Sequence, residues 1–148
     1  RSIKIDMSSI KFCNNEMIQK FKKISLIKQY LNDKIAEIDL YNEKHKIDKS
    51  ELINGRSLTN VGTFRAYIIN YLKNHKNVHK EMTFLVRQLA PKPDGLPIEI
   101  YVFSNDTNWI NYGSIQADIF DHLLSIVQEF ELRVFQNPSG NDFKKIIN

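Results

Sequence analysis

The stretch GLPIEIYVFSNDTNW, residues 95–109, decides the fold class of this chain. Two sets of side chains alternate in it, the first being Ile98, Ile100 and Val102 and the second Glu99, Tyr101 and Phe103. A period of two predicts a β-strand, and the first set marks the face that belongs to the core. The second face is aromatic and carries one acid, where a solvated face usually carries Lys, Thr or Ser. We therefore expect that face to be contacted by something else.

A second strand is predicted just before this one. The run MTFLVRQLA, residues 82–90, leads into the loop PKPDG, in which two prolines end the ladder and Asp94-Gly95 favours a tight turn. The two strands are then antiparallel neighbours. Arg87 is expected on the same face as Glu99, and such a cross-strand pair contributes a few tenths to about 1 kcal/mol.

Three helical segments are predicted around these strands. Residues 14–44 repeat apolar side chains every seven residues, although SLIKQY is expected to bend or split the helix. A coiled coil is the alternative for this segment, and packing within its own domain is favoured. A helix capped by Thr59 or Asn60 runs to His75, and a third helix covers roughly 107–129. The third helix is expected to bury Trp109, Ile119 and Leu123 against Ile98, Ile100 and Val102.

The remaining strands lie at the two ends of the chain. IKIDM alternates near the start, with a change of parity at Ser8-Ser9, and ELRVFQ predicts a last strand before NPSG. When the segment 14–58 is set aside, the order is β-α-β-β-α-β. The expected fold is α+β, a ferredoxin-like antiparallel sheet with helices on one face and a helical insertion after the first strand. Residues 1–148 then form a single domain, and the candidate interface on the open sheet face is Arg87, Glu99, Tyr101 and Phe103.

Composition limits the function classes. The chain has 148 residues and a single cysteine, Cys13, so it has no internal disulfide and fits a reducing compartment. No window approaches the roughly 18 apolar residues of a membrane helix. The opening RSIKIDM already reads as a strand, which indicates a piece cut from a longer protein. Residues 1–80 hold 16 Lys/Arg against 8 Asp/Glu and residues 81–148 hold 5 against 9, so the halves carry about +8 and −4.

Catalytic, cofactor and metal sites are not expected. His75 and His79 have no Cys or acid at ligand spacing, and Asp118 and His122 are explained as an ordinary helix-surface pair. No nucleophile elbow or phosphate loop is present. An aromatic sheet face is typical of RNA-recognition motifs, but their basic-glycine-aromatic signature is missing, so no nucleic-acid partner is expected.

Four longer stretches resemble one family: RSIKIDMSSIKF, NGRSLTNVGTFRAYIINYLKNH, MTFLVRQLAPKPDGLPIEIYVFSNDTNW and IQADIFDHLLSIVQEFELRVFQNPSG. They are similar to the MscS-like mechanosensitive ion channels, and within these to the YbdG-type miniconductance subfamily. The resemblance implies the soluble C-terminal cytoplasmic α/β domain of a channel that protects against hypo-osmotic shock. It is not an enzyme domain, and its role is structure and assembly.

The same resemblance implies a setting for the domain. The expected partners are six further copies in a homo-heptamer and, through missing upstream helices, the inner membrane of a bacterium, with this domain on the cytoplasmic side. Tyr101 and Phe103 then face a neighbour, or else the inserted helices of the same chain cover them. The DFKKIIN tail departs from the C-terminal strand found in such channels. The alternative function is a free-standing ferredoxin-like binding module for RNA or a small regulatory ligand.

Overall fold

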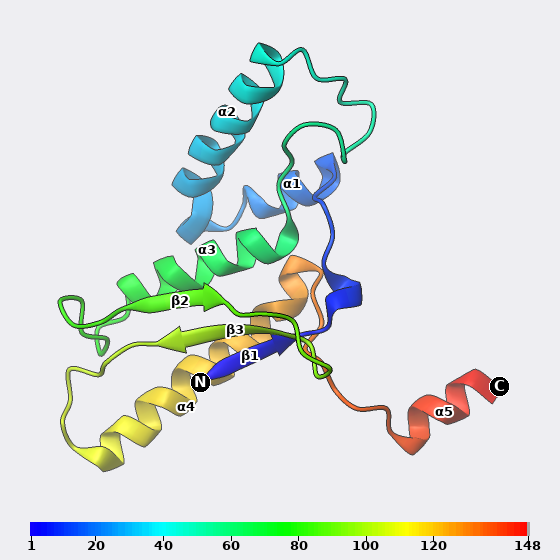
Figure 1. Ribbon diagram of the computed structural model, residues 1–148. Helices are drawn as coiled ribbons and strands as arrows, with labels where there is room; N and C mark the ends of the chain where they lie inside the picture. The colour runs from blue at the N-terminus through cyan, green and yellow to red at the C-terminus, as the bar shows by residue number, and fades with distance from the viewer. Residues whose placement is uncertain (148) are drawn as a thin grey trace.

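The computed structural model describes residues 1–147 and shows a mixed α+β fold (Figure 1). Three strands, β1 (Ser2–Ile5), β2 (Leu85–Gln88) and β3 (Leu96–Tyr101), form an antiparallel sheet in the order β1-β3-β2. The strand predicted from the opening stretch is therefore the centre of the sheet. No helix in residues 1–147 is long and apolar enough to cross a membrane.

The register of β3 with its two neighbours aligns the alternating apolar residues of the three strands. Ile98 lies opposite Ile3 of β1, and Ile100 lies opposite Val86 of β2, so the apolar sets of all three strands share one face. Ile3 and Ile98 are fully buried there. The turn before β3 needs Gly95, which has φ +108° and whose missing Cβ would meet the carbonyl oxygen of Ile5 at 2.6 Å.

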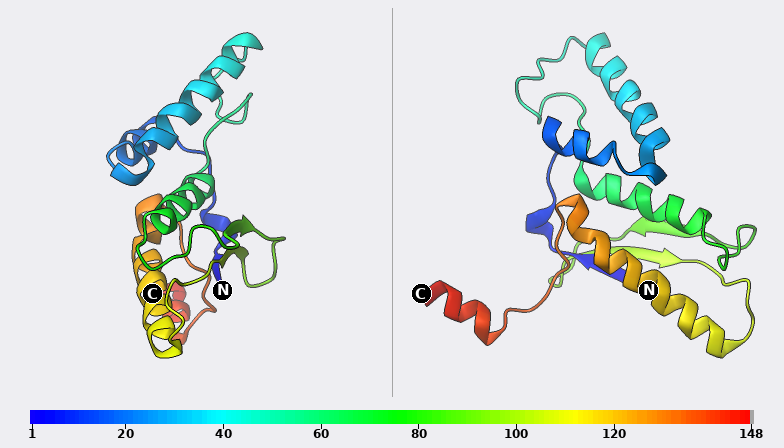
Figure 2. Two further views of the ribbon diagram at one scale, coloured as in Figure 1. Left: turned by 90° about the vertical axis from the view of Figure 1, so that its left-hand side faces the viewer. Right: turned by 180° about the vertical axis from the view of Figure 1, so that it is seen from behind.

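Two helices cover that buried face. Figure 2 shows α3 (Asn60–Lys73) and α4 (Trp109–Ile126) on one side of the sheet and no helix on the other. Thr59 begins α3 as predicted, because its hydroxyl accepts the backbone N–H of Gly62 at 3.1 Å. A 3-10 turn, η3 (Val127–Phe130), continues α4 and places Phe130 against Phe64 of α3 at 5.3 Å between ring centroids.

The insertion forms two helices rather than one. α1 (Asn15–Phe21) ends in a turn, η2 (Ser25–Ile27) follows, and α2 (Lys28–Lys44) then projects away from the sheet (Figure 1). Ile24 is extended at the break, and the predicted seven-residue repeat is interrupted at this point. Apolar residues near the break are buried and join the core shared with α3, so packing overrides the continuous helical pattern: Met17, Phe21, Ile27 and Leu31.

The predicted fourth strand, residues 131–136, is wrong. Only Val134 pairs, in an isolated bridge to Ile5, flanked by hydrogen bonds from Asp6 N–H to the Arg133 carbonyl and from Phe135 N–H to the Lys4 carbonyl, each 2.8 Å. β1 offers no longer edge, because Asp6 already caps the 3-10 turn η1 (Met7–Ser9). A complete four-stranded ferredoxin-like sheet is therefore not formed in the described residues.

The predicted burial of Trp109 is also wrong, since 80% of its surface is exposed. Ile119 and Leu123 of the same helix are buried as expected. The reason is length: 18 residues of helix span about 27 Å, whereas the six residues of β3 span about 20 Å. The first turns of α4 therefore extend past the end of the sheet.

Candidate protein–protein interface

The outer face of the sheet carries the four residues singled out in the sequence. Leu85 lies opposite Tyr101, and Arg87 lies opposite Glu99. The guanidinium of Arg87 donates from Nε and Nη2 to Glu99 Oε1, both at 2.9 Å, which confirms the predicted cross-strand pair. The pair is solvent-accessible, so it contributes at most about 1 kcal/mol and neutralises a charge on this face.

Tyr101 and Phe103 form an aromatic pair at the end of β3. Their rings meet edge to face with centroids 5.5 Å apart, and half of the Tyr101 surface is exposed. The backbone here is fixed by a 2.7 Å hydrogen bond from His79 N–H to the Phe103 carbonyl. The inserted helices α1 and α2 lie beyond α3 and leave Tyr101 uncovered (Figure 1).

The first turns of α4 extend this aromatic area, which sequence reasoning assigned to the core. Trp109, Ile110 and Tyr112 expose 80%, 63% and 46% of their surfaces. Asn108 begins the helix by accepting the Ile110 N–H at 3.0 Å, and Asp106 in turn accepts the Asn108 N–H at 2.8 Å. For Trp109 and Tyr112, the signal in the sequence is the mismatch between helix and strand lengths, whereas Ile110 lies on the side of α4 opposite the buried Ile119.

A groove of about 320 Å³ separates the end of β3 from α4. Aromatic and aliphatic side chains line both of its walls, and the guanidinium of Arg1 lies over the Phe120 ring at 5.6 Å from the centroid. We call the exposed area around this groove the aromatic end surface. Its members are Tyr101, Phe103 and Tyr112, which line the groove, and Trp109, which is exposed one turn before Tyr112 on α4. Exposed aromatic side chains with few charges are typical of residues that become buried at the centres of protein interfaces.

Polar side chains between α3 and α4 serve packing. Tyr67 Oη lies 2.8 Å from His122 Nε2, and the ring of Tyr71 stacks on His122 at 4.2 Å. His75 faces Asp118 at 3.6 Å. His122 therefore contacts α3, and Asp118 contacts His75 just after the end of α3, instead of the two forming the predicted pair along α4. Burial raises the pKa of both tyrosines, so their hydroxyls stay neutral at physiological pH.

The other residues considered for catalysis or metal binding lie in surroundings that do not suit those roles. Cys13 is buried, and desolvation raises the pKa of its thiol to about 11, so it is not an activated nucleophile. Within residues 1–147, no group of three or more His, Cys, Asp and Glu side chains could hold a metal ion. The clearest functional feature in the described residues is therefore a surface for contact.

A family model described as "Mechanosensitive ion channel MscS, C-terminal" matches residues 59–135 of this chain. The match runs from the cap of α3 through β2, β3 and α4 to the segment that pairs with β1, and it is more than half of the 148 residues. No solved structure matches the chain. The chain belongs to the family of C-terminal domains of MscS-like mechanosensitive ion channels.

Proposed function

We propose that this chain is the cytoplasmic C-terminal domain of a YbdG-type channel and that its role there is structure and assembly. The family match supports the channel class. The observation that carries the assembly role is the aromatic end surface, which stays exposed on a domain in which α3 and α4 cover only one face of the sheet. Apolar area of this kind is stabilised when another protein surface removes it from water.

The proposed assembly is a homo-heptamer attached to the inner membrane of a bacterium by helices upstream of this sequence. The full channel would relieve hypo-osmotic stress, and this domain would line its cytoplasmic side. We also propose that residues 1–148 are one domain of ferredoxin-like ancestry with an insertion at about 14–58. The strand order β1-β3-β2, with Val134 beside β1, supports that topology.

Tyr101 and Phe103 are proposed as contacts with a neighbouring subunit or domain, with Arg87 and Glu99 at the rim. Arg87 and Glu99 neutralise each other, so they can border an interface at little cost in desolvation free energy. The alternative of an RNA-binding face is not favoured, because Arg87 is paired with Glu99 and Lys4 of the same face is paired with Asp94. Such a face offers little positive charge to phosphates.

Substitution of Tyr101 tests the proposal in the full-length protein. Tyr101→Glu should leave the thermal unfolding midpoint of the isolated domain nearly unchanged, because the side chain is half exposed. The same change should shift full-length protein in detergent from a heptamer to smaller species on native gels and in size-exclusion chromatography with light scattering.

Tyr41→Glu is the matched control. Tyr41 is an exposed tyrosine on α2, at 38% of its surface, and lies outside the aromatic end surface. It should leave the assembly intact. A full-length Tyr101→Glu protein that stays heptameric would remove Tyr101 from the interface, and a Tyr101→Glu domain that unfolds would mean that its own chain covers this residue.

A further inference from the structure

The C-terminal helix α5 (Gly140–Ile147) has an apolar face and no surface to cover it. Phe143, Ile146 and Ile147 share one side of the helix by their spacing and are 57%, 81% and 83% exposed. Ser139 N–H donates to Asp142 Oδ2 at 2.7 Å, so the first turn is capped. A helix of eight residues is marginal by itself in water, and it therefore needs a surface to pack against.

A pocket in the insertion has the complementary character. It holds about 490 Å³ between α1, α2 and the loop of residues 45–58. Its floor is aliphatic, formed by Ile18, Ile35, Ile38, Leu52 and Leu58. A pocket of this size with such a floor accepts a few apolar side chains. None of its lining residues belongs to the aromatic end surface, and all of them precede the family match, which begins at residue 59.

The loop that forms one wall is held in place before anything binds. The buried side chain of Asn42 donates to the Arg56 carbonyl and accepts the Arg56 N–H, both at 2.9 Å. Gly55 has φ +63°, and a Cβ there would meet Asn42 Oδ1 at 2.4 Å. Lys49 Nζ donates to Ser57 Oγ at 2.7 Å. The pocket is thus preorganised, which lowers the entropic cost of docking.

The charges at its rim select the ligand. Arg56 is paired with Glu37 at 2.9 Å, and Lys49 donates to carbonyl and hydroxyl oxygens of its own loop. Asp39 and Glu43, one turn apart on α2, make no ion pair within residues 1–147. Lys46 follows them at the end of α2. From Lys46 back to Asp39, the rim therefore carries one basic residue followed by two acidic residues. Read forwards, α5 offers the opposite order: Asp142, Lys144 and Lys145.

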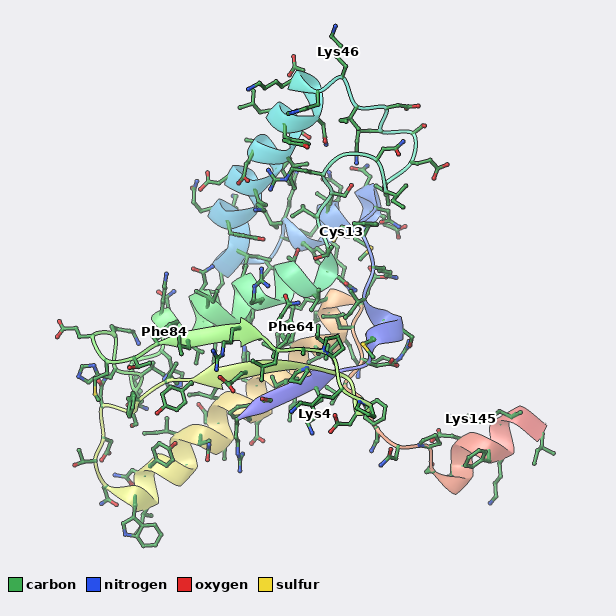
Figure 3. The ribbon with its side chains drawn as sticks, viewed as in Figure 1. Lys4, Cys13, Lys46, Phe64, Phe84 and Lys145 are labelled. Carbon is green, nitrogen blue, oxygen red and sulfur yellow. The ribbon has the colours of Figure 1, made fainter. Side chains whose placement is uncertain are left out.

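We propose that α5 of a second copy of this chain docks in this pocket. Its apolar face covers the aliphatic floor, and Lys144 at the flank of that face approaches Asp39 and Glu43, with Lys145 adding positive charge to the same helix. The α5 of the same chain is badly placed to reach its own pocket, since Figure 3 shows Lys46 at the top of the molecule and Lys145 far from it at the lower right. Phe135 is hydrogen-bonded to Lys4 of β1. The residues from Phe135 to Gly140 span at most roughly 18 Å, which limits how far α5 can move from β1.

This contact joins two different surfaces, so it is heterologous. Contacts of that type build closed rings when the rotation between subunits closes. The inference rests on the proposed channel assembly for its biological setting, in which each tail reaches the insertion of the next subunit at high local concentration. A contact of three apolar side chains and two charges is too small to hold free subunits together, so weak binding is expected.

The test measures binding of a synthetic peptide of residues 136–148, labelled with an uncharged nitrobenzoxadiazole group, to the intact chain. Fluorescence anisotropy should show saturable binding that weakens with salt. Asp39→Lys with Glu43→Lys should weaken it at least tenfold. A peptide carrying Lys144→Glu and Lys145→Glu should recover binding to that variant but bind the unmodified chain poorly. Asp33→Lys, an exposed acid on α2 that does not line the pocket, is the control and should change little.

Circular dichroism of each variant checks that the fold is intact. Absence of saturable binding at millimolar peptide would overturn the proposal, as would charge-reversed chains that bind the unmodified peptide equally well. Binding that is lost with Tyr101→Glu instead would assign the tail to the aromatic end surface and also refute it. Because the assay uses the isolated chain, its failure is distinct from failure of the Tyr101→Glu assembly test.

Discussion

At the residue scale, burial decides what each side chain can do. Cys13, the single thiol, lies in the core beside Leu58, whose carbonyl accepts the Cys13 N–H at 2.8 Å. Tyr101 is of the same general hydrophobic class but lies half exposed at the end of a strand. Composition does not distinguish these two situations. The two residues differ in their exposure to solvent. Burial lets Cys13 contribute to stability, and exposure leaves Tyr101 available for contact with another surface.

The thiol of Cys13 should make stability depend on pH in the alkaline range. Its pKa is raised from 9.0 to about 11, first because burial disfavours the thiolate. The unfolded chain therefore loses this proton before the folded chain does, so the Cys13 contribution is constant below about pH 9 and falls from there to about pH 11. Urea unfolding at several pH values should show this fall relative to Cys13→Ala, which removes the titration.

If the free energy of unfolding of Cys13→Ala fell by the same amount between pH 9 and pH 11, the expectation would be contradicted. Alkylation gives a second reading of the same group. At pH 8 the folded thiol should react with iodoacetamide roughly a hundredfold more slowly than the urea-unfolded thiol from ionisation alone, with burial slowing it further.

At the element scale, each helix is positioned by the part of its apolar stripe that meets a partner. α4 buries Ile119 and Leu123 under the sheet, while Trp109 lies beyond the end of β3. α2 keeps its inward side buried along its length, at Leu31, Ile38 and Asn42, whereas Leu40 on the opposite side is 68% exposed. An apolar stripe thus sets which side of a helix faces inward but not how far along its length the core extends.

Leu123→Ala should test the packing of α4 directly. The side chain is fully buried, so its truncation should lower the free energy of unfolding by roughly 2–5 kcal/mol through lost burial and a residual cavity. Leu124 is the adjacent control, since it is 45% exposed, and Leu124→Ala should change stability by no more than about 0.5 kcal/mol. Chemical denaturation measures both, and equal effects would show that α4 is rotated from the orientation described.

At the scale of the whole molecule, the candidate contact surfaces lie apart from one another. The aromatic end surface lies at one end of the sheet and α4, the insertion with its pocket projects beyond α3, and α5 extends from the opposite end (Figure 1). A molecule with separate contact surfaces of this kind is suited to repeated contacts between copies. Each surface alone is small compared with a stable interface.

The isolated domain should therefore be a monomer or a weak oligomer in dilute solution. A specific interface needs roughly 1,000 Å² of buried area or more, and the membrane part of a channel would otherwise supply high local concentration. Sedimentation velocity at micromolar and at near-millimolar protein should show a concentration-dependent shift toward larger species. A heptamer whose size is independent of concentration would show that the side contacts are stronger than this.

The sequence by itself determined the local features of the fold. The alternation in residues 96–101 placed a strand, Thr59 placed the start of α3, and opposed positions on neighbouring strands placed Arg87 beside Glu99. The sequence also indicated the MscS-like channel family, which the match to residues 59–135 supports. These features depend on periodicity, caps and turns, which act over a few residues.

Only the tertiary structure decided where the core ends. It left Trp109 in water, reduced the expected last strand to a bridge at Val134, and placed His122 against α3 and Asp118 against His75 beyond the end of α3. These outcomes depend on the relative lengths of packed elements and on which edges remain available for pairing. Such quantities exist only once distant segments meet, because apolar residues are buried by a partner surface and not by their own pattern.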